Sequence, residues 1–460
     1  MIASLLALSC QFGSDPQPII DSPSATPRKP DILLVVLDTT RADAFQSYGN
    51  NRPVGENLAT LAQMGTLFTQ AWTSSSWTWP SHASLFTGLY PWEHGAHFAP
   101  PSSSIALKPD PLYASEPDPT LPTLAQRLHD IGYDTAAFSA NRLVGPDFVL
   151  SKGFAVREFL DDDSKVVTRV QSYLKNRAPD KPLFLFVNLM SAHTPWFFND
   201  EPWVKAHQES LKSSTAPDWM KPHLLPNEIG LHPFFPHFKE SLVYHYISGK
   251  KDIPESGKTI IRDLYEAEVR RSDLHLGQVL SMWNVDDSVI AVTSDHGEYL
   301  GEYRLLEHGR TLYPEVLHVP LVWKSPSRKN GVIDAPIPMH FIHDEILREV
   351  GLDAKESLFQ PPESVFAGAW VDHYWAKDLQ GRFTKGYRLQ RRGDEVYIAD
   401  STGVCEGFQL EDNRLGSTLS CPDTVAQTLQ NLFIQSKTGP SVESNAKTLE
   451  QLQKLGYVGH

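Results

Sequence analysis

The sequence predicts an α/β fold in which a doubly wound sheet is flanked by helices and followed by a smaller domain. From Asp31 onward, short apolar runs alternate with amphipathic segments, the pattern of parallel strands and their connecting helices. After Asp344 the pattern changes to short strands of the antiparallel type. The 460 residues are enough for a large catalytic domain plus a smaller one.

The elements follow in a regular order along the chain. A first strand is predicted over residues 32–37, a continuous apolar run that leads into Asp38. After it we expect a helix over 57–64, a strand over 66–72, a loop and helix over 74–88, a helix over 120–132, strands over 135–140 and 183–189, a long helix over 260–283 and a strand that ends at Asp295. In the smaller domain we expect strands over 364–375, 381–390 and 395–399, with a closing helix over 445–455.

The segment Ser74-Ser-Ser-Trp-Thr-Trp-Pro-Ser-His-Ala-Ser-Leu-Phe-Thr-Gly88 predicts a polar loop that turns into a helix. Pro80 is expected at the first helical position and Gly88 just after the last. Thr78 would then lie at the helix N-terminus, where free N–H groups and the helix dipole attract an anion. A hydroxyl there is a candidate nucleophile if something lowers its pKa, and the alternative is an N-cap without catalytic function.

Two predicted strands end in acidic residues. Asp38 follows the first strand, and Asp295 with His296 follows the last strand of the large domain. Ligands of open α/β sheets bind at the carboxyl ends of the strands, so these side chains should meet there. Together with the Thr78 hydroxyl they suit one divalent metal, which would lower the pKa of the hydroxyl and polarise a bound ester. Each acid alone could instead cap a helix or close a turn.

These segments, in this order, resemble the sulfatase family of the alkaline-phosphatase-like superfamily. That family combines a strand ending in Asp with the motif Cys/Ser-x-Pro-Ser-Arg-x-Ser-Leu-x-Thr-Gly and a later Asp-His-Gly or Asp-Asn-Gly. This chain shows Thr78-Trp-Pro-Ser-His-Ala-Ser-Leu-Phe-Thr-Gly88 and Ser294-Asp-His-Gly-Glu298, and His193-Thr-Pro195 is similar to the family's His-x-Pro loop. The resemblance implies a large mixed sheet flanked by helices over 31–344 and a smaller antiparallel sheet plus helix over 345–460.

The departures from the family pattern point away from sulfate. Sulfatases oxidise the Cys or Ser at the nucleophile position to an aldehyde, and threonine cannot form one. Thr39 stands where a second Asp is common, His82 stands where the motif has Arg, and the sequence has no Gly-Lys-x-His-x-Gly segment. The remaining set is more similar to phosphoglycerol transferases of the lipoteichoic acid synthase type and to phosphonate monoester and phosphodiester hydrolases. Two-zinc nucleotide pyrophosphatases also use threonine, but their Asp-x-x-x-His pair is missing here.

The resemblance also implies a role for each site residue. Asp38, Thr78, Asp295 and His296 would hold one divalent ion, Mn²⁺, Mg²⁺, Ca²⁺ or Zn²⁺. His193 and His308 would hold the substrate oxyanion or protonate the leaving oxygen, and His82 would orient the Thr78 loop. For His193 and His308 the alternative is a loop side chain bonded to the backbone.

The predicted function is hydrolysis or transfer of a phosphodiester, phosphonate or phosphate ester through Thr78. The substrate would be an anionic ester of a glycan, a lipid head group or a small molecule. Two alternatives stay open: a sulfuric ester hydrolase of a glycan or aryl sulfate, and a non-catalytic, surface-tethered protein that binds anions. The irregular stretch 199–259 is predicted as a lid inserted over the site, and a second metal site from its histidines is the weaker alternative.

Charge and cysteine content suggest the protein's surroundings. The net charge of −14 argues against nucleic acid as a partner and against adsorption to an anionic bilayer. Residues 1–10 are similar to the end of a lipoprotein signal, with Cys10 as the lipidated residue, and 11–30 form a Pro/Ser-rich tether. This predicts an exported periplasmic or cell-surface lipoprotein, the alternative being an ordinary apolar terminus. Cys405 and Cys421 then pair as a disulfide or remain two free thiols.

Overall fold

The computed structural model describes residues 29–98, 114–196, 202, 204–205, 218–220, 242–371, 379 and 382–439. The predicted signal and tether up to residue 28, including Cys10, the closing helix over 445–455 and most of the predicted lid lie outside these residues. None of the helices in the described part combines the length and the apolar character that a membrane crossing requires.

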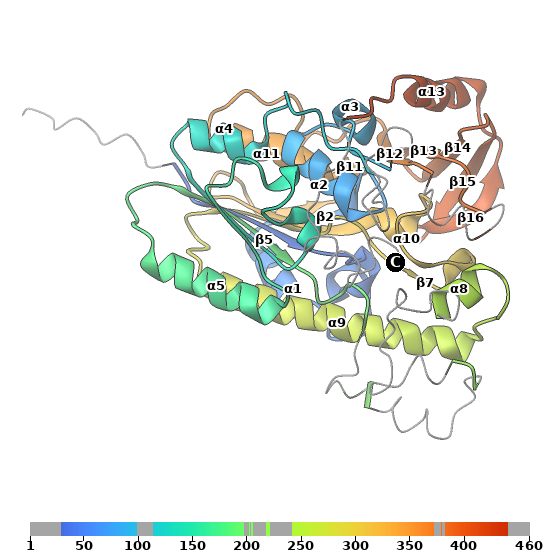
Figure 1. Cartoon of the computed structure of the whole chain (residues 1–460), viewed down its shortest axis with the longest axis horizontal. Coiled ribbons are helices and arrows are strands. Elements are labelled where there is room, and N and C mark those ends of the chain that lie inside the picture. Colours follow the sequence, from blue (N-terminus) through green and yellow to red (C-terminus); the bar gives the residue numbers. More distant parts are fainter. Residues whose placement is uncertain are drawn as a thin grey trace, which may run out of the picture.

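The main sheet contains nine strands. They are β1 (Ile32–Leu37), β2 (Thr66–Trp72), β3 (Asp134–Ser139), β4 (Val156–Phe159), β5 (Leu183–Leu189), β6 (Val289–Thr293), β9 (His318–Lys324), β10 (Gly331–Ile333) and β11 (Ile337–Pro338). Their order is β10-β2-β9-β6-β1-β5-β3-β4, with β11 also paired to β2 (Figure 1). Only the pairings of β9, with β2 and β6, are antiparallel within this sheet. The sheet is therefore mixed, as predicted.

Side chains of β1 alternate between two apolar cores, one on each face of the sheet. Helices therefore cover both faces. Leu33, Val35 and Leu37 pack in the core that contains α1 (Glu56–Met64), α5 (Asp163–Asn176) and α9 (Glu255–Ser281). Ile32, Leu34 and Val36 pack in the core that contains α2 (Thr78–Thr87), α4 (Leu124–Asp130) and α11 (Ile342–Glu349). Figure 1 shows the two groups of helices on opposite sides of the sheet.

A second, antiparallel sheet follows the large one. Its strands, in spatial order, are β12 (Val365–Ala369), β13 (Tyr387–Arg392), β14 (Glu395–Asp400), β15 (Cys405–Glu411) and β16 (Arg414–Leu419), and α13 (Asp423–Ile434) packs on it. Cys405 and Cys421 form a disulfide, which decides between the two alternatives. The N–H of Gly368 donates to the Ser74 carbonyl, and Ser75 Oγ donates to the Gly368 carbonyl. The small sheet thereby supports the loop that precedes Thr78.

The start of α2 differs from our prediction. The helix begins at Thr78 with Trp77 as the N-cap, so Pro80 is the third helical residue instead of the first. Proline is tolerated there because an N–H in the first turn has no partner within the helix. Gly88 ends the helix in a left-handed conformation, with φ 72°, as expected. The correction places Thr78 inside the helix, with its side chain at the open N-terminus.

Other boundaries differ for local reasons. The helix expected from residue 120 is α4, which begins at Leu124 because Thr123 caps it by accepting from the N–H of Gln126. The long helix begins at Glu255 instead of 260, so the described part of the predicted lid contains α8 (Leu242–Ile247) and the first turn of α9. The strand expected from 381 is β13, which starts at Tyr387, and α11 spans the predicted domain boundary at 344/345. The short elements α3 (Pro91–His94), β7 (Tyr299–Leu300), β8 (Leu306–Glu307) and α10 (Pro314–Leu317) complete the described fold.

Candidate active site

The four residues predicted to hold a metal lie together in the structure. Asp38 follows β1, Asp295 and His296 follow the neighbouring strand β6, and the three residues each offer one ligand atom, all within 4.8 Å of one another. Thr78 Oγ1 lies 3.3 Å from His296 Nε2. All four side chains are fully buried. The parallel pairing of β1 with β6 explains this meeting, because both strands end at the same edge of the sheet.

The hydrogen bonds of His296 show which of its ring nitrogens is available. Its Nδ1 lies 2.9 Å from the carbonyl oxygen of Gly297, so Nδ1 carries the proton and donates it. Burial lowers the pKa of His296 well below its usual value, and the neighbouring His308 adds to this, so the ring is neutral. The lone pair of Nε2 therefore faces Thr78 and accepts its hydroxyl proton. A neutral imidazole with its other nitrogen fixed by a carbonyl is the form that binds metal ions.

Two asparagines complete the surroundings of Asp38. Asn141 Nδ2 donates to Asp38 Oδ2 at 2.7 Å, and Asn188 Nδ2 donates to the same oxygen at 3.2 Å. Asn141 Nδ2 also lies 3.3 Å from Thr78 Oγ1. We did not predict either residue from the sequence. The available signals were an amide just beyond the end of β3 and a single polar side chain within the apolar strand β5.

The carboxylates fit a divalent cation. Within the described part of the chain, Asp38 Oδ1 and Asp295 Oδ2 are buried and have no hydrogen-bond partner. Burial raises the pKa of both carboxyls, and for Asp295 the charge of Asp38 raises it further. Two buried carboxylates close together need a compensating positive charge. Carboxylate oxygens, a neutral imidazole and a hydroxyl are ligands that Mg²⁺, Mn²⁺ and Zn²⁺ accept, so the residues present fit the predicted single ion.

His82 lies beneath this cluster, one turn along α2 from Thr78. Its Nδ1 is 3.1 Å from the Thr78 carbonyl oxygen and 3.4 Å from Asp295 Oδ2. The ring packs against Phe86 and Phe186, and burial lowers its pKa. His82 Nδ1 thus lies near both the Thr78 carbonyl and Asp295, with the shorter distance to the carbonyl. That His82 orients Thr78 stays a prediction.

His308 lies next to the His296 ring, and His193 lies next to His308. The His308 ring centroid is 4.2 Å from that of His296 and 5.2 Å from that of His193. His308 Nδ1 lies 3.0 Å from Glu298 Oε1, and the short ribbon of β7 and β8 joins the two residues. Glu298 is fully buried, and burial raises its pKa to about 8. We did not predict Glu298, although it directly follows the Asp-His-Gly sequence.

A cleft of about 190 Å³ reaches His193 from outside. Its walls include Phe159, Met190, Pro195, Glu268 and Arg271. The Asp163 carboxylate accepts from the backbone N–H groups of Met190 and Ser191 at 2.7 and 2.8 Å, and so fixes the loop that carries His193. The cleft therefore borders His193, one of the predicted site residues.

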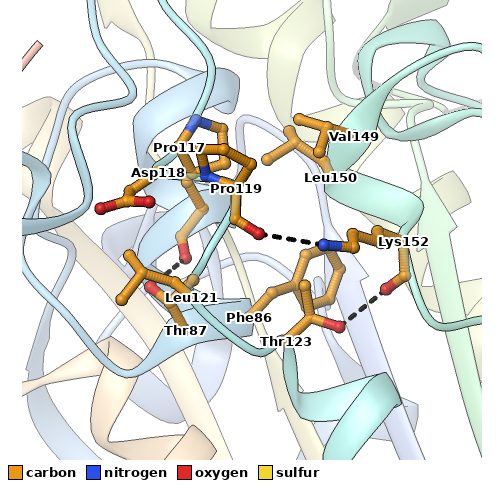
Figure 2. A pocket seen from close by; sticks show the side chains of 11 residues that line it. Phe86, Thr87, Pro117, Asp118, Pro119, Leu121, Thr123, Val149, Leu150 and Lys152 are labelled. Atoms are coloured by element: carbon orange, nitrogen blue, oxygen red, sulfur yellow. Dashed lines mark hydrogen bonds between the residues drawn. The ribbon is translucent and has the colours of Figure 1, made fainter. Parts of the chain in front are cut away.

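A second, much smaller pocket lies behind α2 and belongs to the packing of that helix. Figure 2 shows Phe86 and Thr87 facing Pro117 and Lys152 there, and none of the predicted site residues lines it. Lys152 Nζ donates to the Pro119 carbonyl, and Thr87 Oγ1 donates to the Ala83 carbonyl. The first of these bonds joins the segment at Lys152 to the segment at Pro119, and the second lies within α2.

Comparison with known proteins identifies relatives that match most of this chain. The sequence model described as Sulfatase matches residues 30–351. The uncharacterized sulfatase YidJ of Escherichia coli (strain K12) is 23% identical over 347 residues, which are 67% of this chain and 65% of YidJ, slightly less than two thirds of that relative. The multifunctional alkaline phosphatase superfamily protein PehA of Trinickia caryophylli is 26% identical over 64% of this chain and 68% of its own length. Among solved structures, the phosphonate monoester hydrolase of Agrobacterium radiobacter superimposes with a TM-score of 0.63 at 18% identity, covering 88% of this chain and 96% of that chain.

Proposed function

Because this chain belongs to the sulfatase family, and is thus a family hydrolase of anionic esters, we propose that it cleaves a phosphorus ester with Thr78 as nucleophile. The observation that carries the proposal is the position of the Thr78 hydroxyl. It lies at the N-terminus of α2, between the His296 ring and the Asn141 amide, beside two buried carboxylates with free oxygens. The Cβ of threonine carries a methyl group, so the aldehyde chemistry of sulfatases is not open to this residue.

The residues of the chain supply most of the groups that the reaction requires. Asp38, Asp295, His296 and Thr78 would hold the divalent cation, which supplies a lower pKa for the hydroxyl and positive charge near the ester. The Thr78 hydroxyl gives its proton to solvent, and Oγ1 then forms a bond to phosphorus while the bond from phosphorus to the leaving oxygen breaks in line with it. The positive end of the α2 dipole lies beside the equatorial oxygens and stabilises their charge. Water or an alcohol afterwards releases the ester from Thr78.

The leaving oxygen needs a proton, and His308 is placed to give one. Burial keeps Glu298 protonated near neutral pH, so Glu298 can donate to His308 Nδ1 while Nε2 carries the ring proton. His308 Nε2 gives its proton to the leaving oxygen, and the proton of Glu298 passes to Nδ1. General acid assistance of this kind contributes about 10²–10⁴-fold. Substitution of His308 or His193 by Ala should therefore slow the enzyme without abolishing turnover.

Turnover by the full chain tests the proposal. The chelated protein is reloaded with Mn²⁺, Mg²⁺, Ca²⁺ or Zn²⁺ and assayed on a phosphodiester, a phosphonate ester, a phosphate monoester and an aryl sulfate. We expect turnover of a phosphorus ester that falls by at least about 10⁴-fold in Thr78→Ala. Thr78→Ser is the matched control, because it keeps the hydroxyl and should keep measurable activity.

The other outcomes separate the alternatives. Turnover of aryl sulfate alone, lost in Thr78→Ala, would identify a sulfuric ester hydrolase with an unmodified threonine. Sulfate turnover that survives in Thr78→Ala would mean that the nucleophile is another residue. A protein that binds a cation and turns over none of the four esters would favour the non-catalytic anion-binding alternative.

A further inference from the structure

Asn141 belongs to none of the family motifs described above, yet it lies in the active site. Its side chain is fully buried at the end of β3, and its Nδ2 reaches two different partners. One is Asp38 Oδ2 at 2.7 Å, and the other is Thr78 Oγ1 at 3.3 Å. An amide nitrogen has two hydrogens, so both contacts can be made at once. Asn141 therefore links the carboxylate of the cation site directly to the hydroxyl of the nucleophile.

The hydrogen bonds around Asn141 fix the orientation of its amide. Asn141 Oδ1 accepts from the N–H of Leu143 at 3.0 Å, so the amino group must point toward Asp38 and Thr78. The backbone is held as well, because Asn141 N donates to Ser139 Oγ and Ser139 Oγ donates to the Asn141 carbonyl. The opposite orientation would place Oδ1 against the Asp38 carboxylate. The donor is thus in place before any substrate binds.

We propose that Asn141 is a catalytic residue that donates a hydrogen bond to Thr78 Oγ1 in both steps of the reaction. The inference rests on the proposed function. In the first step, Oγ1 without its proton forms the bond to phosphorus, and the amide holds this oxygen and stabilises its charge. In the second step, water attacks the phosphorus and gives a proton to His308 Nε2, while the proton on His308 Nδ1 returns to Glu298. The bond from phosphorus to Oγ1 breaks and negative charge returns to Oγ1. The N–H of Asn141 faces the oxygen on which that charge develops.

Asn188 provides a matched comparison within the same site. It also donates to Asp38 Oδ2, at 3.2 Å, and it is also fully buried, but no contact joins it to Thr78. A residue that acts only by holding Asp38 should behave like Asn188. Loss of such a supporting bond weakens cation binding by about 10–100-fold. Loss of a donor to a charged oxygen in the transition state lowers kcat by about 10²–10³-fold.

The experiment compares Asn141→Ser with Asn188→Ser in the full chain. Serine at position 141 can still accept from the Leu143 N–H, which protects the local fold. Cation affinity is measured by calorimetry, and kcat is measured at saturating cation. The ester on Thr78 is detected by the intact mass of the protein after rapid quenching. We expect both variants to bind the cation more weakly. Asn141→Ser should lose at least about tenfold more kcat than Asn188→Ser, and it alone should accumulate the Thr78 ester.

Three outcomes decide the inference. Equal losses of kcat in the two variants, without accumulated ester, would overturn it, because Asn141 would then act only through Asp38. If Asn141→Ser does not fold, Asn141→Asp keeps the shape and the acceptor for Leu143, and its added carboxylate retains cation binding. A kcat near that of the wild type in Asn141→Asp would overturn the inference, and a loss of about 10²-fold would support it.

Failure of the proposed function would be visible in the wild type, as cation binding without turnover of any ester. The Asn141 contact is then tested by cation affinity alone, in a double-mutant cycle with Thr78→Ala. Non-additive effects of Asn141→Ser and Thr78→Ala, together with additive effects of Asn188→Ser and Thr78→Ala, would support the contact. Additive effects in both cycles would overturn it.

Discussion

The loops that follow β1 and β6 carry charged side chains in two places, and the two places balance their charge differently. At the active site, Asp38 and Asp295 keep buried oxygens without hydrogen-bond partners among the described residues. A few residues further along the same loops, Arg41 binds Asp43 through two hydrogen bonds of 2.8 Å and binds Glu302 at 2.7 Å. Arg41 provides the counter-charge in the second place, whereas Asp38 and Asp295 have no arginine or lysine partner among the described residues.

The pKa values of the acids shift in opposite directions in these two places. Burial raises the pKa of Asp38 and of Asp295. Burial acts in the same direction on Asp43 and Glu302, but there the charge of Arg41 outweighs it and lowers both pKa values. The pKa shifts thus differ according to whether a guanidinium is within reach, and the side chains of Asp43 and Glu302 also keep some exposure, 32% and 24%. An acid that stays buried without such a partner indicates a binding site for a cation.

The backbone of Arg41 also takes part in holding the turn at Thr39. The backbone N–H of Arg41 donates to the Tyr265 hydroxyl, which in turn donates to the Thr39 carbonyl. Thr39 has a left-handed backbone with φ 56°, and its N–H donates to Asp295 Oδ1 at 3.2 Å. Left-handed backbone is unfavourable for a β-branched residue, so surrounding contacts must maintain it. The two clusters are therefore coupled through the turn at Thr39.

The largest effect is expected from Asp295→Asn, which removes one charge from the unpaired cluster. We expect loss of cation binding and a fall in turnover of at least about 10³-fold, because a charged ligand is gone. Without cation, the variant should be more stable than the wild type by about 1–2 kcal/mol, since a neutral amide replaces a buried charge beside Asp38. Urea unfolding after chelation, and again with added cation, measures both effects.

Asp273→Asn is the matched control for that variant. Asp273 is also buried, but its oxygens accept from the backbone N–H groups of Asn57 and Leu58 at 3.0 and 2.9 Å. Its replacement should lower the free energy of unfolding by about 1–3 kcal/mol and leave cation binding intact. If Asp295→Asn destabilises the chelated protein as Asp273→Asn does, the two aspartates do not differ and the comparison fails.

The next effect in size is expected from Arg41→Met, which removes the counter-charge of the paired cluster. Asp43 and Glu302 then stay behind without their main partner, and the free energy of unfolding should fall by about 3 kcal/mol. Cation affinity should stay close to that of the wild type, because the variant keeps the backbone N–H of residue 41, which supports the turn at Thr39 through Tyr265. Glu302→Gln in the Arg41→Met background should recover part of the stability. Chemical denaturation and calorimetry test both statements.

Lys165→Met removes a cation from a surface pair and serves as the control. Lys165 contacts Asp161 at 2.7 Å, but both side chains are largely exposed. Exposed pairs add little to stability, so no measurable change is expected. A similar loss of stability in Arg41→Met and Lys165→Met would show that burial has no special importance for the Arg41 cluster.

The sequence predicted the active-site residues whose positions depend only on the residues next to them in the chain. Asp38, Asp295 and His296 stand directly after apolar runs, and such runs form buried parallel strands whatever their neighbours are. Thr78 was found because proline and glycine mark its helix. The start of that helix was misplaced by two residues, because several polar residues in a row precede Pro80 and each of them could cap a helix.

The sequence could not predict contacts that depend on the order of the strands in space. Asn141 and Asn188 reach Asp38 because β5 lies beside β1 and β3 lies beside β5, an order that differs from the order along the chain. Arg41 is as polar as any surface residue in the sequence, and only the fold buries it among acids. The strands β15 and β16 were missed because much of their surface is exposed, so their apolar pattern is weak.

The smallest expected effect is the pH dependence of Asp43→Asn, which separates charge from packing in the paired cluster. Although burial raises its pKa, Arg41 and Arg262 lower it below the usual value. A carboxyl with a lowered folded pKa stabilises the protein above its unfolded pKa of about 3.9, and this contribution is lost as the pH falls further. The Asp43 side chain is 32% exposed, so we expect Asp43→Asn to lower the free energy of unfolding by only about 1 kcal/mol at pH 7.

Urea unfolding of chelated wild type and variant at pH 7, 5, 4 and 3 should show this difference shrinking below about pH 4. A difference that stays constant down to pH 3 would mean that Asp43 contributes by shape and hydrogen bonding instead of charge, and the contrast between the two clusters would then rest on Arg41 alone.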